Sequence, residues 1–435
     1  MLVNLVGAPD SGQRELAHAI CAQIGIQAHL LDLARLDAAH LALLERESLL
    51  LQAAFYVELD DESVFRLALD AARQSAPLIL ASREPLHLDQ PALTLTLARP
   101  TAHERVALWG QALNGSADAV DLDALVEQFE FGAGAIARTA AAARQRADLD
   151  GSPLTAAHVR AASRETGSAA LDELAQRIQP GCTWHDLVLP DAALDQLHEI
   201  AAQVNQRYTV YERWGFASSR GRGISALFAG PSGTGKTMTA EVLAGHLDLT
   251  LYRVDLAGMI SKYVGETEKN IRRVFEAAEQ RGVILFFDEA DALFGKRTEV
   301  KDSHDRFANI EINYLLQKME AFPGIAILAT NRRGALDRAF LRRLRFVVEF
   351  PFPDAALRRR MWERVFPPGV PLAALDYDRL ARLEIAGGNI RNIAVNAAFL
   401  AAQQGEPVTM EHLYHAARRE YAKIEKLETE AEFGG

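Results

Sequence analysis

Short apolar runs alternate with amphipathic stretches along most of the chain, a pattern typical of buried parallel strands joined by helices. Three runs in the second half are apolar throughout: 226–229, 283–287 and 325–329. A helical stretch follows the first of them, to about His246, and another helix is expected before it, over 191–212. Residues 1–7 are also apolar, but they lack a basic start and are too short for a signal peptide, so we expect a buried strand there. The pattern predicts an α/β fold.

A glycine-rich segment with a lysine-threonine pair follows the run at 226–229. It consists of Gly230, Pro231, Ser232, Gly233, Thr234, Gly235, Lys236 and Thr237, with Met238 next to it. A strand before it and a helix after it are the context of a phosphate-binding loop, in which glycines turn backbone N–H groups inward and the helix N-terminus adds further donors. We expect Lys236 to contact the β- and γ-phosphates of ATP and the Thr237 hydroxyl to bind Mg²⁺. The alternative is a turn that binds nothing.

Carboxylates end the second apolar run, where Asp288 and Glu289 follow Phe287 directly. The carboxyl end of a buried parallel strand faces the ligand crevice. We therefore expect Asp288 to hold Mg²⁺, directly or through water, and Glu289 to polarise the attacking water. Asn331, just after the third run, stands where a group sensing the γ-phosphate is expected, although alone it is weak support.

Several arginines follow between Arg338 and Arg345. Such a run is usually a solvated basic face, and an arginine that reaches a neighbour's γ-phosphate is the sharper alternative; spacing alone does not choose between them. Over about residues 183–425 the order of motifs resembles the AAA clade of AAA+ ATPases. The resemblance implies a homo-hexameric ring with nucleotide at the subunit interfaces, Arg342 and Arg345 as arginine fingers donated in trans, and Asn331 as the sensor.

Two positions depart from the family's pattern, because Leu344 stands where most members have glycine and Val347 where aspartate is expected. Two further motifs rest on the resemblance. Lys262, Tyr263, Val264 and Gly265 are similar to the family's first pore loop, whose aromatic residue grips extended polypeptide. Gly388 and Arg391 are similar to its second sensor, in which the arginine reaches the γ-phosphate. The alternatives are a core aromatic for Tyr263 and a surface ion pair for Arg391.

The N-terminus repeats the second half of the chain. When it is shifted by 223 positions, Gly7 and Gly12 fall on Gly230 and Gly235. Shifts of 253 and 254 place further matching residues on one another: Pro100 on Pro353, Arg105 on Arg358, Trp109 on Trp362, Gly134 on Gly388, Gly151 on Gly405, Thr155 on Thr409 and His158 on His412. The sequence therefore predicts two tandem AAA+ modules, each a parallel sheet flanked by helices plus a small helical lid.

The first module is expected to be degenerate. Gln13 replaces Lys236, Arg14 replaces Thr237 and Ala137 replaces Arg391, while Asp60-Asp61 is at best a poor copy of Asp288-Glu289. We expect this module to bind ATP weakly or not at all and to build the ring or hold a partner. The expected layout is a sheet at 1–100 and a lid at 101–165, a linker at 166–190, the ATPase core at 191–353, its lid at 354–425 and a tail at 426–435.

The net charge of −11 and pI of about 5.6 disfavour a nucleic-acid motor, which needs a basic surface. No apolar run reaches the ~20 residues of a membrane span, and the distant Cys21 and Cys182 predict reduced thiols in a cytoplasmic protein. H-E-x-x-H is absent, which excludes the membrane-bound AAA metalloproteases. The stretch 416–432 is charged and is expected to be helical, and it either docks on a neighbour or is solvated.

The expected function is ATP hydrolysis that drives the threading or remodelling of a protein partner through a ring pore. The alternative is an assembly scaffold or cap gated by nucleotide, which the degenerate module favours. The phosphate loop, Thr183-Trp184, Trp214-Gly215-Phe216 and the stretch Phe340 to Phe346 resemble bacterial AAA ATPases encoded beside contractile injection systems and phage-tail-like particles. This implies a partner from such a particle, or its cargo.

Overall fold

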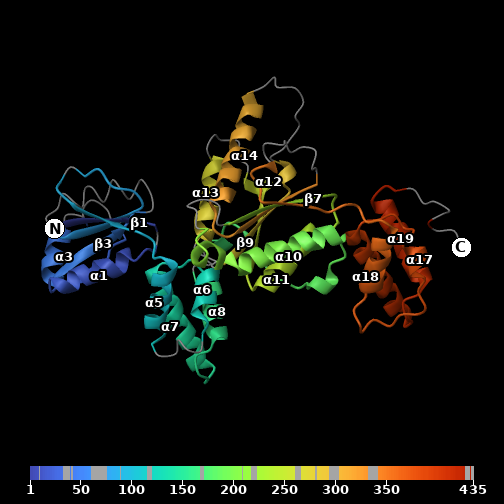
Figure 1. Cartoon of the computed structure of the whole chain (residues 1–435), viewed down its shortest axis with the longest axis horizontal. Coiled ribbons are helices and arrows are strands. Elements are labelled where there is room, and N and C mark those ends of the chain that lie inside the picture. The colour runs from blue at the N-terminus through green and yellow to red at the C-terminus, as the bar shows by residue number, and fades with distance from the viewer. Residues whose placement is uncertain are drawn as a thin grey trace. The chain divides into compact units, whose positions relative to one another are not determined.

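Two stretches of alternating strands and helices divide the computed structural model into two compact units, Met1–Thr166 and Gly167–Gly435 (Figure 1). The structure describes all residues except 9, 33–39, 41–42, 60–75, 89, 115–119, 167–170, 208, 217–222, 260–265, 280–281, 293–302, 332–340, 427–431 and 433–435. Among the described helices, none combines the length and the apolar character needed to cross a membrane.

The first unit is built on a five-stranded parallel sheet in the order β2-β3-β4-β1-β5. Its strands are β1 (Leu2–Gly7), β2 (Gln27–Leu30), β3 (Ala53–Glu58), β4 (Leu78–Ser82) and β5 (Leu93–Leu97). β3 and β4 are buried along almost their whole length because both faces of the sheet are covered. Helix α1 (Gln13–Gln23) packs on one face through Ala17 and Cys21, and α3 (Leu44–Leu51) packs on the other through Leu44.

Four helices complete the first unit and enclose a core of their own around Trp109, Phe129 and Phe131. They are α5 (Ala102–Leu113), α6 (Leu122–Gln128), α7 (Ala133–Leu149) and α8 (Ala156–Glu165). Threonine side chains begin two of them: Thr101 forms a capping box with Glu104, and Thr155 forms one with His158.

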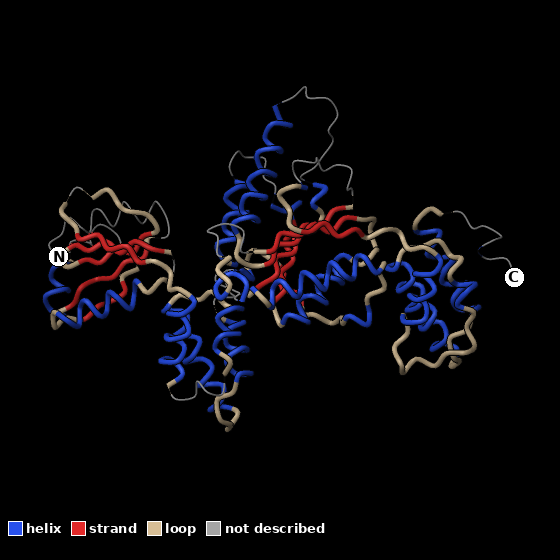
Figure 2. Tube along the Cα trace, in the orientation of Figure 1, coloured by secondary structure: helices blue, strands red, loops and turns tan. Residues whose placement is uncertain are grey.

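The second unit holds a six-stranded sheet in the order β11-β7-β10-β9-β8-β6, shown in red in Figure 2. The strands are β6 (Gln176–Ile178), β7 (Ile224–Ala229), β8 (Thr250–Asp255), β9 (Val283–Asp288), β10 (Ile325–Thr330) and β11 (Phe346–Glu349). All neighbours pair in parallel except β6, which runs antiparallel to β8. The run Val283–Phe287 is fully buried, which explains why it is apolar without alternation.

Helices cover both faces of this sheet. They are α10 (Asp191–Asn205), α11 (Lys236–Leu247), α12 (Leu256–Met259), α13 (Glu266–Ala278) and α14 (Ser303–Ala321). The helix expected over 191–212 ends at Asn205, and a π-helical turn, Thr209–Arg213, follows it. Short 3₁₀ turns lie at Trp184–Asp186 and Ala290–Ala292.

A small helical domain, red at the C-terminal end of Figure 1, completes the second unit. It comprises α16 (Ala355–Arg364), α17 (Tyr377–Leu380), α18 (Gly387–Gln404) and α19 (Met410–Lys423). Its core gathers around Trp362, whose indole N–H donates to the Leu380 carbonyl at 3.0 Å. Helix α19 ends at Lys423, inside the stretch 416–432 that was expected to be helical, and residues 427–431 of that stretch lie outside the described residues.

The two sheets share one strand order. Numbered along each module, both read 5-1-4-3-2, and β6 is an extra strand on the second sheet. The repeat superimposes Leu5 on Phe228, and these two residues pair with Ala81 and Ala329, so the strand register makes Ala81 the counterpart of Ala329. The expected α/β fold, with parallel sheets flanked by helices, is confirmed. The sheet of the first unit has the strand order of the second one.

Candidate nucleotide site

The loop 230–237 joins the carboxyl end of β7 to the start of α11, at the middle of the sheet. Two of its glycines are left-handed, Gly233 at φ 78° and Gly235 at φ 99°, a conformation that side chains rarely adopt. A Cβ atom on Gly230 would lie 2.0 Å from the Phe350 carbonyl oxygen, so only glycine fits beside the end of β11. Met238 packs against the apolar core below the loop. The glycines are therefore required by the path of the loop.

Lys236 is only 8% exposed, and its ammonium group is held at the loop. It donates to the carbonyl oxygens of Gly230 at 2.6 Å and Pro231 at 2.9 Å, and to Oδ1 of Asn331 at 2.9 Å. Burial lowers the pKa of Lys236, and the charges of Asp288 and Asp291 oppose that shift. The structure thus joins the lysine of the loop to the residue that sequence reasoning placed as a sensor.

Asp288 is the last residue of β9, and Glu289 follows it in a left-handed conformation at φ 52°. The Asp288 carboxylate accepts the Glu289 N–H at 2.9 Å and lies 2.8 Å from the guanidinium of Arg253 on β8. Glu289 is exposed. Sequence reasoning missed Arg253; the signal was a lone charge inside the apolar strand that neighbours the acidic one.

Asp291 organises the end of the neighbouring strand β10. Its carboxylate accepts the Thr330 hydroxyl at 2.5 Å and the Asn331 N–H at 3.0 Å. Since Asn331 in turn accepts from Lys236, a chain of hydrogen bonds links the acidic turn after β9 to the phosphate loop. Asp291 was visible in the sequence beside Glu289, but only the structure gives it this positioning contact.

Arg342 and Arg345 are exposed on the segment before β11. The Arg345 guanidinium donates to the Tyr211 hydroxyl at 3.0 Å and to the Gly223 carbonyl at 3.4 Å. Leu344, the departure from the family's glycine, is 8% exposed and belongs to the core, while Val347 is half-buried against that core. The leucine therefore anchors the segment between the two arginines.

The helical domain touches the phosphate loop directly. The Gly388 N–H, in the first turn of α18, donates to the Gly233 carbonyl at 2.9 Å. Arg391 is exposed one turn further on, and its charge contributes to lowering the pKa of Asp186, an effect led by hydrogen bonds from Thr183. The pore-loop prediction, Lys262 to Gly265, lies outside the described residues.

The residues present fit a magnesium nucleotide. The glycine cradle leaves no room for a Cβ atom at Gly230, and the left-handed residues turn the loop around the N-terminus of α11. Thr237 and Asp288 offer the hydroxyl and carboxylate oxygens that Mg²⁺ prefers. The polar residues 236, 288, 291 and 331 follow the carboxyl ends of adjacent strands or the loop between them, as in other open parallel sheets.

The corresponding loop of the first unit keeps the same hydrogen bonds with different side chains. The Gln13 amide donates to the carbonyls of Gly7 and Ala8, at 3.0 Å each, and thus copies the two backbone contacts of Lys236. Ser11 donates to Ala8 at 2.6 Å, as Thr234 does to Pro231 at 2.8 Å. Asp10 and Gly12 are left-handed, at φ 61° and 104°. The loop conformation is retained without its cation.

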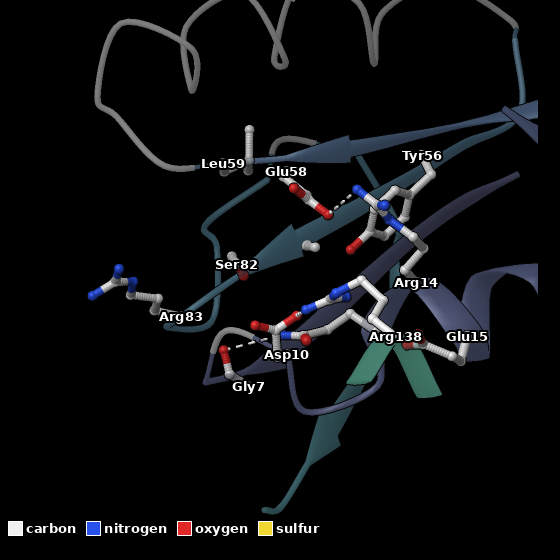
Figure 3. Close-up of a pocket in the computed structure, with 12 residues that line it drawn as sticks. Gly7, Asp10, Arg14, Glu15, Tyr56, Glu58, Leu59, Ser82, Arg83 and Arg138 are labelled. Carbon is white, nitrogen blue, oxygen red and sulfur yellow. Dashed lines mark hydrogen bonds and ion pairs between the residues drawn. The ribbon is translucent and has the colours of Figure 1, made fainter. Parts of the chain in front are cut away.

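The residues of two ion pairs line a cavity of about 380 Å³ beside that loop (Figure 3). Arg14, at the position of Thr237, lies 3.0 Å from Glu58. Strand register places Glu58 at the position of Asp288, since Glu58 pairs with Ala81, the counterpart of Ala329. Arg138 on α7 lies 2.6 Å from Asp10. Glu58 is therefore the acidic counterpart that sequence reasoning sought at Asp60-Asp61, residues that lie outside the description.

Comparisons with known proteins agree with this geometry. The family described as "ATPase family associated with various cellular activities (AAA)" matches residues 226–354. A second family, described as "Contractile injection system ATPase helical domain", matches residues 101–176, which include α5 to α8.

Curated relatives match about half of the chain. A proteasome-activating nucleotidase of Methanopyrus kandleri is 29% identical over 57% of this chain and 58% of its own length. A 26S proteasome regulatory subunit 10B homolog of Arabidopsis thaliana is 31% identical over 48% of this chain and 54% of its own. An uncharacterized AAA family ATPase of Sinorhizobium fredii is 35% identical over 47% of this chain and 60% of its own. The chain therefore spans a little over half the length of these relatives; its residues 226–354 carry an AAA domain, and its residues 101–176 match the helical domain of contractile injection system ATPases.

Proposed function

We propose that the second unit hydrolyses ATP and uses the cycle to remodel a protein partner drawn through the pore of a homo-hexameric ring. The observation that carries the proposal is the chain of contacts from Lys236 through Asn331 to Asp291, beside Asp288 and Glu289. It supports the proposal because an ammonium group and two carboxylates lie together at the end of one sheet, and phosphoryl transfer needs a cation, a metal ligand and a base in such an arrangement.

The loop residues 230–237 bind the phosphates through backbone N–H groups, and Lys236 adds a positive charge there. Thr237 and Asp288 would hold Mg²⁺, which would neutralise phosphate charge there. Glu289 accepts a proton from the attacking water and orients it, and its exposure leaves its carboxylate accessible to that water. Asn331, fixed by Asp291, positions Lys236 against the γ-phosphate.

Charge stabilisation by a neighbouring subunit completes the proposed site. Arg342 and Arg345 are exposed, as fingers donated in trans must be. The contact of Gly388 with Gly233 joins the helical domain to the phosphate loop, so that a change at the loop moves α18 and Arg391 with it. Removing an arginine finger typically costs 10³–10⁵ in rate.

The substrate is proposed to be a protein. Two relatives bear the names of proteasome components, and the sequence of Tyr263 and Val264 suits a pore loop that grips extended chain. The helical domain at 101–176 supports a role in assembling or loading a contractile injection system. Most of this helical domain lies in the first unit and the candidate ATPase site lies in the second, so turnover and partner choice are proposed to be separate.

The test uses Glu289→Gln and Tyr263→Ala in the full chain. Glu289→Gln is expected to bind ATP, to lose turnover by at least about 10²-fold and to accumulate as hexamers in ATP by mass photometry. Tyr263→Ala is expected to hydrolyse ATP yet fail to unfold a tagged partner. If wild type hydrolyses no ATP, the proposed mechanism is wrong.

A second candidate function is a scaffold gated by nucleotide, and the first unit favours it. There Arg14 and Glu58 replace the magnesium ligands, and Arg138 ties α7 to the loop, so the unit is proposed to stay closed without nucleotide. A scaffold of this kind tolerates Tyr263→Ala, whereas a threading machine does not. Assembly assays with that variant therefore separate the two functions.

A further inference from the structure

Five exposed apolar residues lie around β2, the edge strand of the first sheet, and we call them the β2 edge surface. They are Ile24, Leu30, Leu49, Leu50 and Leu51, with exposures of 55%, 58%, 73%, 71% and 50%. The Gln27 N–H donates to the Gln52 carbonyl at 3.0 Å, which places the end of α3 beside the start of β2. Grouped exposed apolar side chains of this kind mark interaction sites more often than scattered ones do.

Strand β2 pairs on one side only within the described part of the chain. The N–H groups of Gln27 and Leu31 donate toward β3, to Gln52 and Tyr56. Because successive residues of a parallel strand point their N–H groups to opposite sides, those of Ala28 and Leu30 face away from β3. An edge of this kind is a template for another strand.

The second unit shows what covers the equivalent edge. There β6 pairs antiparallel with Leu251, Tyr252 and Arg253 of β8. Both the 223-residue repeat and the strand register place these three residues on Ala28, His29 and Leu30. The residues that precede β6, among them Leu171 and Leu174, pack into the core of the second unit. A covering strand is therefore an established part of this architecture.

A side-chain hydrogen bond that the covering segment forms in the second unit has no equivalent at β2 among the described residues. The Tyr252 hydroxyl donates to Asp172 of the covering segment at 2.8 Å. Its counterpart His29 has a buried Nε2 with no hydrogen-bond partner among the described residues. A buried nitrogen without a partner is costly, and a polar group of a bound segment placed like Asp172 would satisfy it.

The surface is also more apolar than its counterpart. Leu30 stands where the second unit has Arg253, and Leu49, Leu50 and Leu51 stand where it has Glu279, Gln280 and Arg281. This second alignment follows from a shared contact, since Thr250 donates to Gly282 as Gln27 does to Gln52. Four positions that are polar in the second unit are leucine in the first. A segment that covers this edge is therefore expected to be more apolar than the segment around β6.

We propose that the β2 edge surface binds an extended, apolar segment of another protein, which adds antiparallel to β2 and places a polar or acidic side chain against His29. β6, the strand that covers the equivalent edge of the second unit, is itself paired with β8. The proposal rests on the partner-holding role given above to the first unit, and it is independent of ATP hydrolysis. Main-chain pairing supplies the affinity and the leucines supply the side-chain preference.

The experiment selects binders from a phage-displayed library of twelve-residue random peptides on immobilised full-length protein. The polar-edge variant carries Leu30→Arg, Leu49→Glu, Leu50→Gln and Leu51→Arg, which restores the side chains of the second unit. Leu149→Arg is the matched control, since Leu149 is an 86% exposed leucine of the same unit, at the end of α7. Synthetic consensus peptides are then titrated by fluorescence anisotropy, with ATP turnover measured in parallel.

Wild type and Leu149→Arg are expected to bind peptides with alternating apolar residues equally, and the polar-edge variant at least about tenfold more weakly. His29→Phe is expected to weaken only peptides that carry the acidic residue. ATP turnover should be unchanged in all these variants. If the wild-type protein itself hydrolyses no ATP, the ATPase proposal fails, and the peptide titrations still test the edge proposal. The edge proposal is overturned if no consensus emerges, if the polar-edge variant binds equally, or if that variant changes only the oligomeric mass, which would make the surface a self-contact.

Discussion

The two phosphate loops of this chain have one backbone conformation and two kinds of chemistry. In each, a side chain at the start of a helix donates to two carbonyls of the loop, Gln13 in the first unit and Lys236 in the second. Where the second unit offers ligands for a metal, the first has the ion pair of Arg14 with Glu58. The comparison shows that the loop's shape depends on glycines and carbonyl contacts, and not on the charge that binds phosphate.

The largest expected effect comes from giving the second loop the side chain of the first. Lys236→Gln can keep the contacts with Gly230 and Pro231, as Gln13 does with Gly7 and Ala8, so folding should be preserved. Turnover is expected to fall by at least about 10²-fold, because the buried cation beside the phosphates is lost. Steady-state ATPase assays with thermal unfolding check this, with Gln13→Ala as the control that should leave turnover unchanged. Normal turnover in Lys236→Gln would break the comparison.

The reverse exchange should create a nucleotide site. Gln13→Lys, Arg14→Thr, Asp10→Gly and Glu58→Asp give the first loop the residues of the second, in a chain that also carries Lys236→Gln. We expect Mg²⁺-dependent binding of a fluorescent ADP analogue, in the micromolar to millimolar range, at about −4 to −8 kcal/mol. Gln13→Lys alone, with the pair of Arg14 and Glu58 intact, is the control and should bind none. Equal binding by the unmodified first loop would contradict its proposed degeneracy.

The helical domains offer a smaller test, in the buried tryptophans that the repeat superimposes. The Trp362 indole N–H donates to Leu380, whereas the Trp109 indole nitrogen has no partner in the described structure. Both side chains are fully buried, so replacement by phenylalanine opens a similar cavity in each. Trp362→Phe is expected to lower the free energy of unfolding by about 1–2 kcal/mol more than Trp109→Phe does. Scanning calorimetry of the full chain compares them, and equal costs would make the hydrogen bond irrelevant.

The smallest effect is expected at the ion pair of Arg138 with Asp10. Both side chains are substantially exposed, at 51% and 36%, so the pair contributes less than about 1 kcal/mol at low salt and less at high salt. Arg138→Gln should lower the melting temperature of the first unit slightly, and added salt should remove the difference between variant and wild type. A large loss that salt does not change would mean that Arg138 acts through packing.

Sequence reasoning reached the fold and the residues of the loop because both are locally encoded. Apolar runs without alternation predict buried parallel strands, and glycine, lysine and threonine at fixed spacing predict the cradle. The internal repeat predicted the architecture of the first unit because it too can be read from local residue patterns. Contacts across the sheet were not accessible in this way: the pairing of Arg253 with Asp288 and the place of Glu58 follow from strand register, which one sequence does not show.

Boundaries were less well predicted than elements. The helix expected to reach 212 ends at Asn205. The prediction was wrong there because the π-helical turn that follows the helix has no simple periodic signal in the sequence. Asp291 was read as one more acid in a turn, and its hold on Asn331 depends on the approach of β10. The roles of Arg342, Arg345 and Arg391 depend on a neighbouring subunit or a bound phosphate, and they stay predictions.

The contact between Arg253 and Asp288 gives the resting site its own counter-ion. Under the proposed function, loading of a metal nucleotide would exchange one cation at Asp288 for another, and the apparent affinity would be the difference between the two pairings. Such an exchange would discriminate against free Mg²⁺, because a lone ion would replace an existing partner without adding phosphate contacts. The proposed site would therefore respond more strongly to the complex of metal and nucleotide than to the free metal ion.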